Sequence, residues 1–215
     1  GGTSWQRVLG PYSPGWDMED MIIHPANPDI LLVTVLKGSG GFFYKSTDGG
    51  TSWRQVTGGL PDSTSVGRSL VAVSKASPNF VIAMVTDYFG HFVGVYKSAD
   101  FGETWTRTAL NLSGAEATRL DYHVALTIHP ADPNIFFAGG LYLFRTTDGG
   151  NTWSSVDPGH ADQHYLAWSG STLFAGTDGG IYKSTNNGSA WINLNTNIIL
   201  TQFYPGLGLD YLNPS

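Results

Sequence analysis

An eight-residue motif occurs four times in this 215-residue chain, and every copy ends in tryptophan. Each copy opens with Ser or Thr, has Asp or Asn at its third position and contains Gly; the copies span residues 46–53, 98–105, 146–153 and 184–191. Their tryptophans, together with Trp5, recur at intervals of 38 to 52 residues. A repeat of that length is typical of one small structural unit that packs against copies of itself to bury its apolar face.

We name these four segments the boxes, and their composition is that of a tight turn. The short side chain at the third position can accept hydrogen bonds from nearby backbone N–H groups, while Gly supplies the positive φ at which the chain reverses. Repetition in every unit favours a structural role for these residues, which are Asp48, Asp100, Asp148 and Asn186. The indole that closes each box is large enough to cover a seam between neighbouring sheets; these residues are Trp53, Trp105, Trp153 and Trp191.

Two further patterns accompany the boxes. An aromatic residue followed by Lys or Arg precedes each box, at 44–45, 96–97, 144–145 and 182–183, in a short alternating run typical of a half-buried strand. We expect the basic stem to lie along its sheet with the charge in solvent. Upstream, two apolar runs separated by a turn rich in Pro, Asn or Gly recur at 22–30, 71–80, 127–135 and 166–173. Each unit is therefore predicted to contain four antiparallel strands, with the box between the third and the fourth.

Units of this kind predict an all-β fold, a β-propeller arc of four-stranded antiparallel blades. Within one segment spanning 1–215, complete blades are expected at 17–56, 69–108, 122–156 and 164–194, and partial blades at 1–8 and 202–215. Joining the two ends would leave that blade without its second and third strands. We therefore expect an open arc, a fragment of a larger propeller whose remainder covers the exposed edges.

The boxes, at this spacing, resemble the Asp-box or bacterial-neuraminidase repeats of sialidases, xyloglucan-degrading enzymes, sortilin-type receptors and photosystem-assembly factors. A nearer resemblance is to exported bacterial repeat proteins, carried by the segments 160–164, 177–180, 181–184 and 201–204. The resemblance implies a propeller in a secreted protein, extracellular or at the cell surface. It does not imply one activity, because unrelated activities share the repeat.

Charge and composition exclude several classes of function. The formal net charge is −6 and Lys and Arg are not clustered, which argues against a nucleic-acid or anionic membrane partner. No apolar run approaches the roughly 20 residues of a membrane-spanning helix. The chain has no Cys, so disulfides, thiolate metal sites and cysteine nucleophiles are absent.

The predicted meander places the boxes and the Pro-rich turns at one end of each blade and the irregular loops at the other. Loops on a rigid scaffold are where function usually lies. We name the second end the loop-rich end; its polar and aromatic residues include Asp17, Glu19, Asp20, Arg68, Asp87, Tyr88, His91, Arg119, Asp121, Tyr122, His160, Asp162, His164 and Asp178.

The sharpest local signal at this end is His160-Ala161-Asp162-Gln163-His164. Alternate side chains of an extended segment share a face, so its two His and one Asp could converge on a divalent metal ion or a substrate hydroxyl. The alternative is a hydrogen-bonded loop with no ligand, and no cofactor is certain. Ligand contacts are expected around six residues of this end: His160, Asp162, His164, Asp178, Arg68 and Asp121.

Two functions fit these observations. The first is a non-catalytic propeller segment of an exported protein, which presents the loop-rich end to a protein or a glycan. The alternative is an arc of a glycoside hydrolase of the xyloglucanase or sialidase-like type, with carboxylates among Asp17, Asp20, Asp121 and Asp178. A sialidase is disfavoured, because only Arg68 and Arg119 occupy suitable positions before a first strand and a third Arg is missing.

Overall fold

The computed structural model describes residues 2–10, 16–38, 40–122 and 124–197. Within these ranges every strand belongs to one of four antiparallel sheets, each with its four strands in chain order. The first sheet comprises β1 (Trp16–Ile23), β2 (Leu31–Lys37), β3 (Gly40–Ser46) and β4 (Arg54–Val56). The second comprises β5 (Ser69–Val73), β6 (Val81–Thr86), β7 (Phe92–Ser98) and β8 (Thr106–Arg107). The third comprises β9 (Ala125–Ile128), β10 (Phe136–Gly139), β11 (Leu143–Thr146) and β12 (Ser154–Val156). The fourth comprises β13 (Gln163–Ser169), β14 (Thr172–Thr177), β15 (Gly180–Ser184) and β16 (Ile192–Asn193).

The remaining regular structure is three short 3-10 turns, η1 (Ser63–Ser65), η2 (Gly114–Ala117) and η3 (Asn195–Asn197). Among the described residues, no helix is long and apolar enough to cross a bilayer. Residues 2–10 carry no strand, and 202–215 lie outside the described residues, so both partial blades stay predictions.

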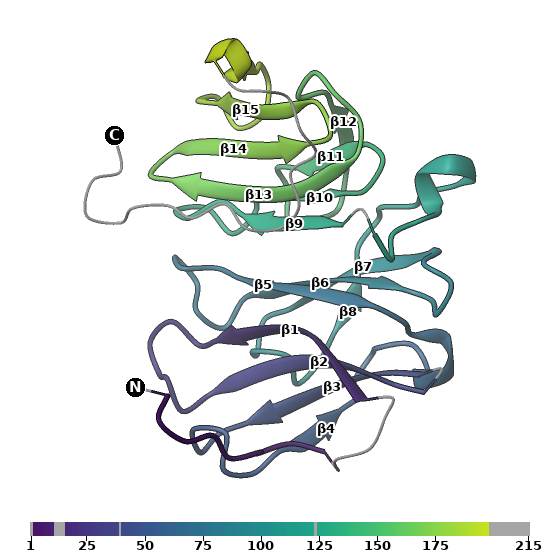
Figure 1. The fold of residues 1–215 in the computed structure, drawn as a ribbon, viewed down its shortest axis with the longest axis vertical. Helices are drawn as coiled ribbons and strands as arrows, with labels where there is room; N and C mark the ends of the chain where they lie inside the picture. Colours follow the sequence, from purple (N-terminus) through teal and green to yellow (C-terminus); the bar gives the residue numbers. More distant parts are fainter. Residues whose placement is uncertain (1, 11–15, 39, 123, 198–215) are drawn as a thin grey trace.

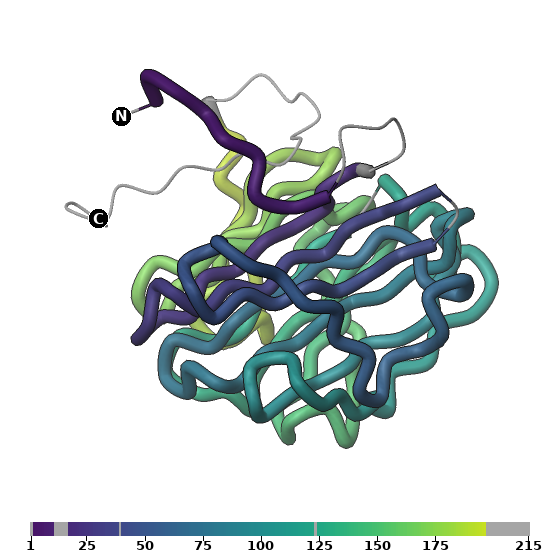
Figure 2. The backbone as a smooth tube through the Cα atoms, turned by 90° about the horizontal axis from the view of Figure 1, so that it is seen from below, coloured from purple at the N-terminus to yellow at the C-terminus, as the bar shows by residue number. Residues whose placement is uncertain are grey.

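The four sheets follow one another in space in chain order, and their first strands lie together (Figure 1). Strand β1 contacts β5, β5 contacts β9, and β9 contacts β13. A view turned by 90° shows strands of successive sheets running in similar directions, with turns collected at opposite ends (Figure 2). We name these four first strands, β1, β5, β9 and β13, the inner strands. Their N-terminal ends therefore meet at one end of the molecule, the loop-rich end.

Apolar residues fill the seams between successive sheets. Strand β6 is buried along its whole length and alternates between two seams: Val81, Ala83 and Val85 pack toward the first sheet, and Ile82 and Met84 toward the third. A continuous run of β-branched and aliphatic residues suits a strand covered on both faces. Burial on both faces thus explains why apolar and polar residues do not alternate along β6.

The boxes form the turns between the third and fourth strands through one recurring set of hydrogen bonds. In the first box, Ser46 Oγ donates to Asp48 Oδ1 at 2.8 Å, and Gly50 N donates to Ser46 Oγ at 2.9 Å. Ser52 N also donates to Asp48 Oδ1, at 2.8 Å. The fourth box makes the equivalent bonds, with Ser184 in the place of Ser46 and Asn186 in the place of Asp48. The turn chemistry read from the sequence is thus the chemistry of the folded boxes.

The basic residue before each of the first three boxes contacts the next sheet, contrary to the expectation that its charge lies in solvent. Lys45 Nζ donates to the carbonyl of Asp100 at 3.4 Å and pairs with Glu103 at 2.8 Å. Lys97 Nζ donates to the carbonyl of Gly149 at 2.6 Å, and Arg145 Nη1 donates to the carbonyl of Asn187 at 2.6 Å. Each cation therefore satisfies a carbonyl of the following box and ties two sheets together.

The tryptophans lie against the seam with the preceding sheet. Trp105 is buried and contacts Phe43 of β3 edge to face, with ring centroids 5.6 Å apart. Trp153 contacts Phe136 at 5.3 Å within the core between the second and third sheets, and Trp191 packs on the core between the third and fourth. Trp53 is half-buried and belongs to none of the three core clusters.

Acid should destabilise the fold by protonating the Asp carboxylates of the boxes. The Ser52 hydroxyl lowers the pKa of Asp48 to about 2, and the Thr152 hydroxyl does the same for Asp148. At Asp100, burial raises the pKa, but the hydrogen bonds from Thr104, Ser98 and the Glu103 backbone together outweigh it, and the pKa again falls to about 2. Because the folded-state pKa of each carboxyl lies below its ordinary value of 3.8, this stability is present above about pH 4 and lost as pH falls toward 2.

The check is the thermal midpoint, followed by circular dichroism from pH 6 to pH 2. The triple variant Asp48→Asn, Asp100→Asn, Asp148→Asn is expected to flatten the fall between pH 4 and 2, and Asn186 shows that a box accepts Asn. An unchanged slope in the triple variant would mean that other groups cause the acid sensitivity.

Candidate functional site

A pocket of about 250 Å³ lies where the four inner strands meet. We name it the inner-strand pocket; its lining comes from all four sheets and comprises Glu19, Asp20, Arg68, Leu70, Val124, Ala125, Leu126, His164, Tyr165 and Leu166. Its base is aliphatic, while two carboxyls, a guanidinium and an imidazole supply polar groups. An apolar cavity with a few convergent polar groups is the usual form of a small-molecule or substrate site.

Two β-bulges direct polar side chains into this pocket. The β1–β2 register shifts between Met18 and Asp20, at Glu19, and the β13–β14 register shifts between Gln163 and Tyr165, at His164. A bulge adds one residue to a strand and changes the direction of its side chain, so bulges are frequent beside functional sites. The first and fourth sheets thus each contribute a titratable group to the pocket.

Arg68 is the cation of the pocket, and protein groups already engage it. Its Nε lies 3.0 Å from Glu19 Oε2, and its Nη1 donates to the carbonyl of Asp121. Burial raises the pKa of Glu19, and the Arg68 charge opposes that rise. Arg68 therefore joins the first and third sheets across the second, a structural link that accompanies its predicted ligand role.

Asp20 connects two inner strands. Its Oδ2 accepts a hydrogen bond from Val71 N of β5 at 2.9 Å, and its Oδ1 accepts one from Met21 N at 2.8 Å. Burial raises the pKa of Asp20 against the effect of these two N–H groups. With one oxygen bonded to each backbone amide, Asp20 serves to hold β1 against β5.

Asp178 lies in the turn between β14 and β15 and is held by a buried histidine. His164 Nε2 and Asp178 Oδ1 share a hydrogen bond of 2.6 Å. The His164 side chain is 1% exposed, whereas that of Asp178 is 26% exposed. The ring of Tyr122 meets the His164 ring edge to face at 5.7 Å. An oriented carboxylate that solvent reaches is suited to proton transfer with a bound substrate.

The His-x-Asp-x-His segment does not adopt the expected extended form. Asp162 has a φ of +60°, which turns the chain, and the bulge at His164 changes the alternation again. His160 consequently bonds its own neighbour, with Nδ1 2.9 Å from the Ala161 carbonyl, and its ring lies against Gly179. His164 alone of the three lines the inner-strand pocket.

The metal ion predicted at His160, Asp162 and His164 gains no support from this arrangement. Among the residues that the structure describes, no three His, Asp or Glu side chains are grouped so as to hold a metal ion. A metal ion there, like ligand contacts at the six predicted residues, stays a prediction. The arrangement does bring four of the six together. Arg68 and His164 line one pocket, Arg68 bonds the carbonyl of Asp121, and His164 bonds Asp178.

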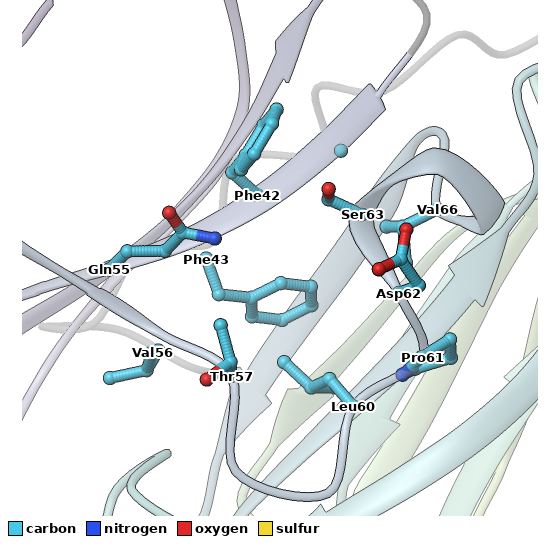
Figure 3. A pocket seen from close by; sticks show the side chains of 11 residues that line it. Phe42, Phe43, Gln55, Val56, Thr57, Leu60, Pro61, Asp62, Ser63 and Val66 are labelled. Carbon is cyan, nitrogen blue, oxygen red and sulfur yellow. The ribbon is translucent and has the colours of Figure 1, made fainter.

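A second cavity, of about 400 Å³, lies between the outer strands β3 and β4 and the segment that follows them. Phe43 and Leu60 face each other across it, with Gln55 at its rim (Figure 3). A cavity of about 340 Å³ occupies the corresponding place after β12 and includes His160. Because a cavity recurs at equivalent positions of two sheets, we interpret these two cavities as a feature of the repeat. We therefore take the inner-strand pocket as the candidate site.

No family model matches the chain. The chain is 28% identical to a xyloglucanase of Hypocrea jecorina over 87% of its own length and 27% of that protein. The GH74 xyloglucanase from Xanthomonas campestris superposes with a TM-score of 0.66 at 17% identity, over 85% of this chain and 31% of that one. The Niastella koreensis GH74 enzyme gives 0.62 at 20% identity, over 84% and 30%.

The chain is a β-propeller arc. It spans about a quarter of the length of the curated relatives it matches. Those relatives are named as xyloglucanases, which favours the glycoside hydrolase alternative over the non-catalytic segment that the sequence first suggested.

Proposed function

We propose that this chain is one arc of a glycan-cleaving propeller of the xyloglucanase type, and that its inner-strand pocket and the adjoining Asp178 belong to the substrate site. The observation that carries the proposal is the combination of similarity to a xyloglucanase over 87% of the chain with a polar pocket built by all four inner strands. Because such a polymer is too large to cross a bilayer unaided, the proposal includes export of the protein.

Asp178 is the carboxyl that we assign to proton transfer. His164 fixes one of its oxygens, and its partial exposure leaves it accessible to a glycosidic oxygen. Glycoside hydrolysis needs a second carboxylate on the other side of the scissile bond. Asp121 is exposed beside Tyr122, whose ring contacts His164, and is our candidate for that role.

The electrostatics favour a neutral substrate. The chain carries a net charge of −6, and Glu19 already neutralises the cation that lines the pocket. A polyanion would meet repulsion there without a free cluster of basic groups. A neutral, hydroxyl-rich polysaccharide can instead use the carboxylates as hydrogen-bond acceptors.

The full-length protein is expected to release reducing ends from xyloglucan and none from polygalacturonate, a polyanion of similar size. The measurement is a reducing-end assay with both polymers at equal mass, checked by size-exclusion chromatography of the products. Absence of reducing ends from xyloglucan would reject the hydrolase. Binding of xyloglucan without cleavage would then favour the non-catalytic glycan-binding function instead.

A further inference from the structure

Two neighbouring aromatic rings project from the turn between β6 and β7. The Tyr88 side chain is 54% exposed and that of Phe89 is 74% exposed, and their rings meet edge to face at 5.5 Å. Removing such a ring from water on binding is favourable, because the driving force grows with the apolar area that is buried. Two adjacent rings left in water form a contiguous apolar patch, which typically marks a binding surface.

The turn that carries these rings is held in one conformation. Asp87 Oδ1 accepts hydrogen bonds from Phe89 N at 2.8 Å and from His91 N at 2.9 Å, and Asp87 Oδ2 lies 2.8 Å from the His91 ring. Gly90 has a φ of +77°, and a Cβ there would come within 2.5 Å of Asp121. The rings are therefore presented by a tight turn, which reduces the entropy lost on binding.

This turn adjoins the candidate site. Leu120 N donates to the Gly90 carbonyl at 2.9 Å, and the next residue, Asp121, accepts a bond from Arg68 of the inner-strand pocket. Tyr122 follows and contacts His164. A continuous path thus leads from the exposed rings, past Asp121 and Tyr122, to Asp178.

We propose that Tyr88 and Phe89 form a stacking site for a sugar ring of the polysaccharide, an outer subsite next to the cleavage site. The C–H face of a pyranose is attracted to the negative face of an aromatic ring, while its hydroxyls need polar partners. His91, whose ring lies 6.2 Å from the Phe89 ring, and Asp121, whose carboxyl lies beside Gly90, are the polar groups next to the two rings. This inference rests on the proposed function, because it takes the polysaccharide as the ligand.

The test is isothermal titration of the full-length protein with soluble xyloglucan oligosaccharides. The double variant Tyr88→Ala, Phe89→Ala is expected to raise Kd about tenfold or more, a change of about 1.4 kcal/mol, since it removes both ring faces. Tyr88→Trp, Phe89→Trp keeps two ring faces and should bind within about threefold of the wild type. Trp5→Ala removes a ring that is 91% exposed outside this turn and should leave Kd unchanged.

A double alanine variant with the wild-type thermal midpoint and the wild-type Kd would overturn the subsite while leaving hydrolysis intact. Failure of the tryptophan variant to retain affinity would also overturn it, because stacking needs only the ring faces. If the wild type neither binds nor cleaves xyloglucan, the proposed function fails and the subsite fails with it.

Discussion

Trp105→Ala is expected to lower the free energy of unfolding by about 3–5 kcal/mol, the usual cost of removing a buried Trp side chain. The indole is 5% exposed and lies in the seam between the first and second sheets, against Phe43. Its Nε1 donates to the Gly102 carbonyl at 3.0 Å, so the same substitution also leaves a buried carbonyl without its donor. Urea unfolding followed by circular dichroism measures the change.

The matched control is Trp5→Ala, because Trp5 is 91% exposed. That variant is expected to change the free energy of unfolding by less than about 0.5 kcal/mol. Equal losses for Trp105→Ala and Trp5→Ala would contradict the assignment of the box tryptophans to the seams between sheets.

The fold was predictable because residues close together in the sequence specify the strands and turns of each repeat. Ser46, Asp48 and Gly50 specify a turn through bonds within five residues, and the same bonds recur in the other boxes. Alternation and Pro-rich turns then place the strands. Repetition makes each of these signals visible four times in one chain.

The contacts between sheets were not predictable in the same way. The bond from Lys97 to the Gly149 carbonyl joins residues 52 positions apart, and the sequence around Lys97 resembles an ordinary half-exposed strand. Expecting the charge in solvent was therefore wrong, because the next box places a carbonyl within reach of the ammonium group.

The candidate site was predicted only in part. The sequence indicated Arg68, Asp121, His164 and Asp178, but it grouped His164 with His160 on the assumption of an extended segment. The positive φ of Asp162 and the bulge at His164 separate those two rings.

Glu19 contacts Arg68 because another bulge, in β1, turns its side chain into the pocket. No sequence motif marks Glu19. Bulges depend on the pairing register, which a single sequence does not display.

Asp178→Asn is expected to reduce kcat on xyloglucan by about 100-fold or more, because a positioned general acid or base typically contributes 10²–10⁴-fold. The amide keeps the size of the carboxyl and retains an oxygen that can accept a bond from His164, so the fold should persist. Asp29→Asn is the matched control: Asp29 is exposed in the turn between β1 and β2, at the opposite end of the first sheet. The control should keep the wild-type rate.

The measurement that tests the proposed site most directly is the initial rate of reducing-end release from xyloglucan by the wild-type full-length protein, Asp178→Asn and Asp29→Asn at equal thermal midpoints. Saturable release is expected from the wild type and Asp29→Asn, and a rate at least about 100-fold lower from Asp178→Asn. Rates within twofold of one another for all three proteins would contradict the proposed site, because cleavage would then not depend on the carboxyl that His164 holds beside the inner-strand pocket.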